Sequence, residues 1–268
     1  MTLTTREHHR AGEHAWALGT AGLLLGMCAA AGAAQLWKLL IIAVASCLSM
    51  IAGAVLGRRA IANSHVLTWA NGATAGAMVT SACAFLLPMA ITQDPKLGGF
   101  GTATGVLVGF ALHNADRLST RTTPDDCVVR LTIHAVTAGL VIGAVYASMP
   151  NAGVLLGLSI VSHKGPAGYA AARSLRRAGE PVTPVVLPAC GVGISSIAVG
   201  LLGWSPPTSV TAVVFGVAAG LFLHVALDFL AHLERTPEPS GGRLSTHATA
   251  STLTGGAVVV FAWMLTGA

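Results

Sequence analysis

Long apolar stretches separated by short polar segments run through most of the 268-residue chain. A helix that crosses a bilayer needs about 20 mainly apolar residues. By this criterion the pattern predicts nine membrane-spanning helices. They cover residues 15–33, 37–57, 66–91, 98–116, 128–149, 152–172, 184–203, 208–231 and 249–267. None of the polar spacers is long enough to form a soluble domain, so we expect one all-α, polytopic helix bundle.

The arginines fall on one side of this predicted bundle. With nine spans, the N-terminus and the loops near residues 58, 121, 176 and 240 share a membrane face. All twelve arginines belong to that face, whereas the other face has only Lys38 and Lys96. Because positively charged residues collect on the cytoplasmic side, the pattern predicts a cytoplasmic N-terminus and an external C-terminus in the cell membrane of a bacterium. The net charge of +5 then needs no nucleic-acid partner.

The composition supports a membrane protein and excludes several other classes. Only 9% of the residues are charged, against about 25% in a soluble domain. The five cysteines show no Cys-x-x-Cys spacing, so they are interpreted as small buried apolar residues, not as disulfides or a zinc cluster. There is no phosphate-binding loop, nucleophile elbow or His-Glu-x-x-His motif, so we expect neither an enzyme nor a bound cofactor.

Two consecutive predicted spans carry the same motif, His-x-x-x-Ala-Gly, at His134–Gly139 and His163–Gly168. A histidine in hydrocarbon is costly and marks a functional site by default. The alternative is a pair of core histidines, each hydrogen-bonded to a neighbouring helix. We expect Gly139 and Gly168 to let the two helices approach closely. Pro166 should free backbone carbonyl groups that can line a cavity.

The order of these motifs resembles the ZIP (Zrt/Irt-like) family of divalent-metal transporters. The run from Ala70 to Leu86-Leu87-Pro88 is similar to the family's second helix, a small-residue stretch that ends in a Leu-Leu-Pro turn. Residues 220–230 resemble its seventh helix, and the two histidine motifs resemble its fourth and fifth. The resemblance covers residues 37–267. It implies an eight-helix transporter domain at 37–268, preceded by a tail and an extra helix at 1–36.

The resemblance also implies a function and a site. The expected function is transport of zinc or a similar divalent transition metal toward the cytoplasm. The expected ligands are His134 and His163, between the helices at 128–149 and 152–172. The motif carboxylates of the family are replaced by Ala138 and Ala167, which predicts a degenerate site with weak or altered metal binding. The implied partners are the lipid bilayer, the metal ion as substrate and a second copy of the chain in a homodimer.

Four further residues are secondary candidates for the metal site: one lysine and three residues that lie together on another predicted helix. Lys164 stands where some family members bind a second ion, so its ammonium group would take the place of that metal; alternatively it extends to another partner. His224, Asp228 and His232 recur every four residues and could form a metal relay, although the favoured interpretation is a hydrated helix end with a His–Asp pair. Two other functions stay open: a non-transporting or regulatory relative, and a transporter of a non-metal solute.

Overall fold

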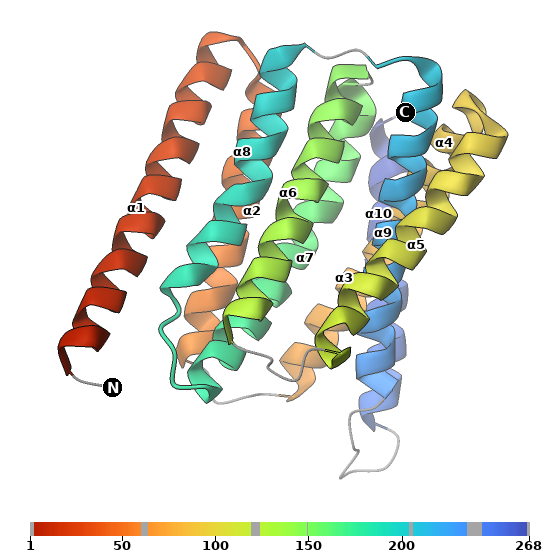
Figure 1. The fold of residues 1–268 in the computed structure, drawn as a ribbon. Helices are drawn as coiled ribbons and strands as arrows, with labels where there is room; N and C mark the ends of the chain where they lie inside the picture. The colour runs from red at the N-terminus through yellow and green to blue at the C-terminus, as the bar shows by residue number, and fades with distance from the viewer. Residues whose placement is uncertain are drawn as a thin grey trace.

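A computed structural model describes residues 3–59, 64–118, 124–148, 150–203, 206–234 and 243–266, and within them the structure is helical with no strand (Figure 1). The α-helices are α1 (Leu3–Ala33), α2 (Trp37–Arg59), α3 (Ser64–Ser81), α4 (Leu87–Gln93), α5 (Pro95–Leu118), α6 (Pro124–Ser148), α7 (Pro150–Arg177), α8 (Val186–Leu202), α9 (Thr208–Glu234) and α10 (Arg243–Thr266). A π-helical turn (η1, Ala82–Leu86) joins α3 to α4, and a short 3-10 turn (η2, Thr183–Val185) precedes α8. The all-α prediction is therefore confirmed, and every predicted span overlaps a helical segment.

Several helices are long and apolar enough to cross a membrane. Five segments of the described chain meet this criterion: Ala15–Ala33, Trp37–Arg59, Thr68–Gln93, Thr183–Leu202 and Thr208–Ala231. A further apolar segment, Leu131–Ala147, is shorter. Large apolar side chains such as Trp16, Leu107 and Phe261 are exposed, as expected for surfaces that face lipid. The chain is thus a multi-pass membrane protein.

The polar spacers determine where the helices begin and end. Proline occupies the first position of α5, α6 and α7, where its missing N–H group costs no intrahelical hydrogen bond. Asp94 caps α5, because its Oδ1 accepts hydrogen bonds from the backbone N–H groups of Lys96 (2.9 Å) and Leu97 (3.0 Å). Gly203 ends α8 in the left-handed conformation, with φ of 57°.

The helix that carries the Leu-Leu-Pro sequence continues past it, whereas the resemblance implies a turn there. The π-helical turn η1 lies just before Pro88, and the N–H group of Leu87 bonds to the carbonyl oxygen of Ala82. Proline cannot donate within a regular helix, and one wide turn accommodates it without ending the helix. The segment therefore runs on to Gln93.

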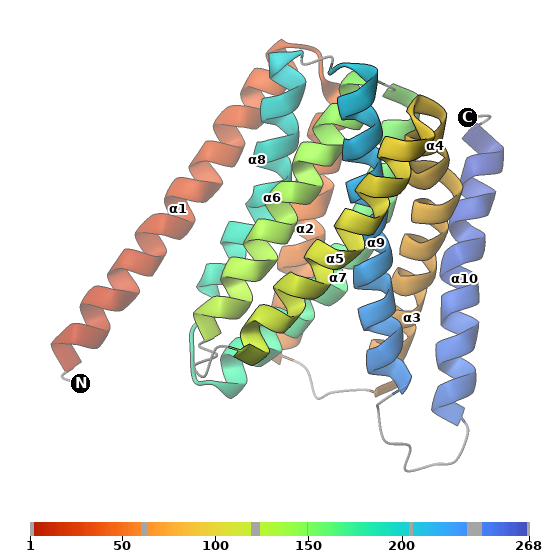
Figure 2. The same cartoon turned by 45° about the vertical axis from the view of Figure 1, so that its right-hand side comes forward.

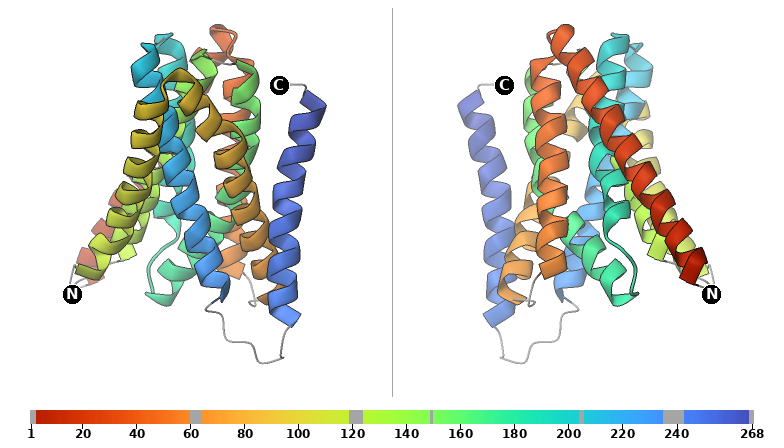
Figure 3. Two further views of the ribbon diagram at one scale, coloured as in Figure 1. Left: turned by 90° about the vertical axis from the view of Figure 1, so that its right-hand side faces the viewer. Right: turned by 90° about the vertical axis from the view of Figure 1, so that its left-hand side faces the viewer.

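The bundle consists of two packed groups of helices (Figures 2 and 3). In the first group α2 packs along α7, α6 along α8, and α2 also contacts α8. In the second group α5 packs along α9, and α3 packs along α10 and α9. The helix α1 lies at the edge of the bundle, against α8. The two groups meet where α3 contacts α7 and α6 contacts α9, and the predicted histidine motifs lie on this boundary.

Candidate metal site

The structure brings His134 and His163 together. His134 lies near the middle of α6 and His163 near the middle of α7, and their ring centres are 5.8 Å apart with planes inclined by 60°. Imidazole nitrogens bind zinc at about 2 Å, so two rings that share an ion have centres about 5–6 Å apart. The spacing is therefore compatible with a shared ion.

His163 and the adjacent Lys164 are buried, whereas His134 is half-buried. Only 2% of His163 and 1% of Lys164 is exposed. The rings of His163 and Phe222 on α9 form a T-shaped contact, with their centres 6.2 Å apart and their planes inclined by 82°. Burial of this kind lowers the local dielectric constant, which strengthens electrostatic interactions within the site.

Nε2 of His134 and Nζ of Lys164 are buried nitrogen atoms that have no hydrogen-bond partner among the described residues. An unsatisfied buried polar group costs about 1–3 kcal/mol, so native proteins rarely leave one without a functional reason. For Nε2 of His134, the structure does not provide the hydrogen bond to a neighbouring helix that the core-histidine alternative requires.

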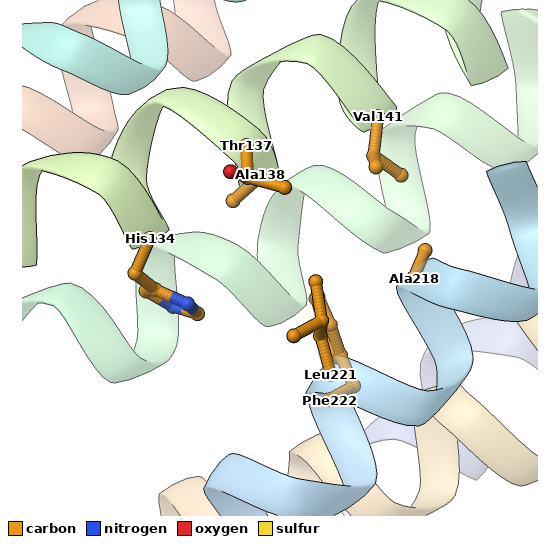
Figure 4. Close-up of a pocket in the computed structure, with 7 residues that line it drawn as sticks. All are labelled: His134, Thr137, Ala138, Val141, Ala218, Leu221 and Phe222. Carbon is orange, nitrogen blue, oxygen red and sulfur yellow. The ribbon is translucent and has the colours of Figure 1, made fainter. Parts of the chain in front are cut away.

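A small cavity adjoins His134 (Figure 4). Its volume is about 10 Å³, the space of roughly one water molecule. The cavity is lined from α6 by His134, Thr137, Ala138 and Val141, and from α9 by Ala218, Leu221 and Phe222. His134 and Ala138 thus share one face of α6, as the i, i+4 spacing predicts. The side chain that Ala138 contributes to the cavity lining is a methyl group.

The glycines of the two motifs do not bring α6 and α7 together, and that prediction is wrong. A Cβ atom added to Gly139 would clash with Val192 and Ser195 of α8, and one added to Gly168 would clash with the carbonyl group of Met50 on α2. Each glycine instead allows its helix to pack closely on a helix of the same group. The histidine of each motif precedes the glycine by five positions, which is about 140° around the helix axis.

The proline of the second motif lies inside α7, which continues through it. Pro166 has no N–H group to offer the carbonyl oxygen four residues earlier, at position 162. The neighbouring carbonyl oxygen, of Val161, accepts a hydrogen bond from Oγ of Ser49 on α2 at 3.0 Å. Similarly, the hydroxyl group of Thr137 donates to the carbonyl oxygen of Ile133 at 2.8 Å. Thr137 lines the cavity, but its proton is committed to its own helix.

In the part of the chain that the structure describes, no third metal-ligand side chain joins the histidine pair. Among the described residues, no group of three or more histidine, cysteine, aspartate or glutamate side chains is arranged to hold a metal ion. Protein zinc sites normally use three or four such ligands. Two neutral imidazoles also leave the charge of a divalent ion uncompensated.

The three secondary candidates other than Lys164 lie on α9. His224 packs against α5, since a Cβ atom added to Gly109 would lie 2.6 Å from the imidazole ring. Asp228 is exposed. The side chain of His232 lies outside the described part of the structure. The side chains of His224 and Asp228 do not join the His134–His163 pair in a larger ligand group.

Two contacts between distant parts of the chain were not predicted. The buried sulfur atoms of Cys47 on α2 and Cys190 on α8 are 3.9 Å apart. At one end of the bundle, the rings of His65 and His247 are 5.0 Å apart, and Nε1 of Trp69 donates to Nδ1 of His247 at 3.1 Å. The single residues carry no sequence signal for either contact, because both depend on which helices become neighbours.

Comparison of the sequence with family models and with curated proteins gave no match.

Proposed function

We propose that this protein carries a divalent transition-metal cation, zinc or a similar ion, across the membrane toward the cytoplasm. The observation that carries the proposal is the meeting of His134 and His163 from two adjacent helices, deep in a membrane bundle and beside a cavity. Imidazole is a ligand suited to zinc, copper and nickel. The ZIP-like order of motifs supports the same assignment.

The proposed site is degenerate. Ala138 and Ala167 replace the carboxylates of the family pattern, and Lys164 adds a buried cationic group next to His163. We expect a single bound ion, held weakly and completed by water or backbone oxygen atoms. Lys164 takes the place that a second ion would occupy.

In the proposed arrangement nine helical segments cross the bilayer, with α3, η1 and α4 counted as one segment. The eight segments after α1 form the transporter domain. Ten arginines belong to described helices, at the starts of α1, α6 and α10 and the ends of α2, α5 and α7. These helix ends lie together at one end of the bundle (Figure 1). That segregation supports a cytoplasmic N-terminus, an external C-terminus and a location in the cell membrane.

Metal uptake by proteoliposomes tests the proposal. Purified protein is reconstituted with a zinc-sensitive dye inside the vesicles, and the initial rate of fluorescence increase is measured after addition of Zn²⁺. The H134A/H163A variant should lose at least about tenfold in rate, since both proposed ligands are removed. The matched control is H65A/H247A, which removes another histidine ring pair of similar spacing and should transport like the parent protein.

A second candidate function is favoured by the missing carboxylates and by Lys164. It is a ZIP-like bundle that does not transport metal but has a regulatory role, or that carries a non-metal solute. A parent protein that shows no uptake of Zn²⁺, Mn²⁺, Fe²⁺ or Cu²⁺ would favour this candidate. So would equal uptake by the parent and the H134A/H163A variant.

A further inference from the structure

A large cavity opens at the arginine-rich end of the bundle, between the end of α2, the end of α7 and the segment that leads into α8. Its volume is about 640 Å³, within the range of cavities that bind small molecules. It is lined by Val55, Arg58, Arg59, Arg176, Glu180, Pro181, Val182 and Thr183. It is separate from the histidine site, which lies near the middle of α6 and α7.

Three arginines converge on this cavity. Arg58 and Arg59 are the last two residues of α2, and Arg176 lies in the last turn of α7. Nη1 of Arg176 donates a hydrogen bond to the backbone carbonyl oxygen of Arg58, which ties the two helix ends together and fixes the position of this guanidinium group. The site is thus built by tertiary packing.

These guanidinium groups keep their charge available. Among the described residues, none of the three arginines is in an ion pair with a carboxylate. Glu180 is the one acidic residue in the lining, so the formal charge of the lining is +2. A planar guanidinium group donates two parallel hydrogen bonds to a phosphate group, which makes arginine the preferred residue for phosphate recognition.

Apolar groups lie beside the charged ones. Val55 is 42% exposed and precedes the arginines by about one helical turn, toward the middle of the membrane. Pro181 and Val182 add apolar surface on the other side of the cavity. Basic pockets between membrane helices at the cytoplasmic side are typical binding sites for anionic lipid head groups. The combination of guanidinium groups with apolar surface fits a phosphate ester attached to an acyl-bearing group.

We infer that this cavity binds an anionic phosphate ester through Arg58, Arg59 and Arg176. The phosphate oxygen atoms take hydrogen bonds from the guanidinium groups, with the hydroxyl group of Thr183 at the rim. Two sources have this chemistry: the head group of an anionic membrane lipid and a free phosphate compound of the cytoplasm. The inference does not depend on metal transport.

Thermal unfolding of the full-length protein in a neutral detergent tests this inference. One arm adds phosphatidylglycerol, a second adds inorganic phosphate, and phosphatidylcholine serves as the zwitterionic control. We expect phosphatidylglycerol to raise the melting temperature by several degrees and phosphatidylcholine to have a much smaller effect. A shift with inorganic phosphate alone would identify a free phosphate compound as the ligand.

Matched variants connect the shift to the cavity. In R58Q/R59Q/R176Q the apparent affinity for the active ligand should fall at least about tenfold, whereas R6Q/R10Q/R243Q, which changes three arginines of the same predicted membrane face on α1 and α10, should bind like the parent. Where the first triple variant is not monodisperse, R176Q alone is used and should weaken binding severalfold. The inference is overturned if neither ligand stabilises the parent protein, if phosphatidylcholine acts as strongly as phosphatidylglycerol, or if the cavity variants bind like the parent.

Discussion

The proposed site contains two metal ligands and, next to them, a lysine that opposes binding of a cation. His134 and His163 present imidazole groups at a distance that one ion can bridge, yet the adjacent Lys164 places an ammonium group in the same buried region. Nζ of Lys164 has no hydrogen-bond partner in the described part of the chain. A buried polar group without a partner lowers the free energy of unfolding, so this lysine is kept at a cost to stability.

Replacing this lysine by an apolar residue of similar length tests that cost. We expect Lys164→Met to raise the free energy of unfolding by about 1–3 kcal/mol, because the buried ammonium group is removed while the volume is preserved. The same variant should bind Zn²⁺ more tightly, since a repulsive charge is lost. The checks are the melting temperature in detergent and a zinc titration. Lys38→Met, at an exposed position, is the control, and a K164M protein that melts below the parent would contradict this account.

At the scale of helices, close backbone contacts decide which faces meet. Gly53 and Gly57 of α2 lie against the backbone of α7 at Gly165 and Tyr169, where a Cβ atom would clash. Gly139 does the same between α6 and α8. Small residues allow this approach in membrane bundles, where dispersion forces and not burial from water hold helices together.

The contact between α2 and α8 can be tested with their own cysteines. In a protein with Cys28, Cys83 and Cys127 replaced by serine, oxidation by copper–phenanthroline should join Cys47 to Cys190, because their sulfur atoms are 3.9 Å apart. The cross-link closes a long loop, so the denatured chain should migrate faster on a non-reducing gel and return to its original mobility after reduction. Adding Cys190→Ser should abolish the change. A parent background that never cross-links would contradict the packing of α2 on α8.

The sequence predicted the helices well and their contacts poorly. Apolar length and proline or aspartate at the boundaries are local signals, so the ranges near α5, α6 and α7 follow from them. The helices that pack against Gly139 and Gly168 do not follow from local signals, because a glycine indicates a close contact without indicating the partner. The Cys47–Cys190 contact joins positions 143 residues apart and was missed for the same reason. The His134–His163 pair was predicted because both motifs occur on consecutive helices.

Across the whole molecule, charge is segregated toward one end of the bundle. The start of α1 and the end of α10 lie at opposite ends of it (Figure 3). The ten arginines of the described helices belong to helix ends on the side that includes the phosphate-binding cavity proposed above, and the opposite side has Lys38 and Lys96. The positive-inside rule predicts this distribution for the proposed topology of nine crossings.

Labelling of single cysteines in intact cells tests this orientation. In a cysteine-free background, Lys96→Cys at the start of α5 should react with a membrane-impermeant maleimide, whereas Arg176→Cys at the end of α7 should react only after the cells are opened. Both positions are exposed, so access to solvent is matched. Labelling of both positions in intact cells, or the reverse pattern, would contradict the proposed topology.

The central claim is that His134 and His163 bind one divalent metal ion, and X-ray absorption spectroscopy of the protein loaded with one equivalent of Zn²⁺ tests it most directly. The account predicts a first shell of nitrogen and oxygen atoms at about 2.0–2.1 Å with the outer-shell scattering of two imidazole rings. That imidazole signal should disappear in H134A/H163A and persist in H65A/H247A. A parent protein that retains no zinc, or a spectrum that is unchanged in H134A/H163A, would contradict the claim.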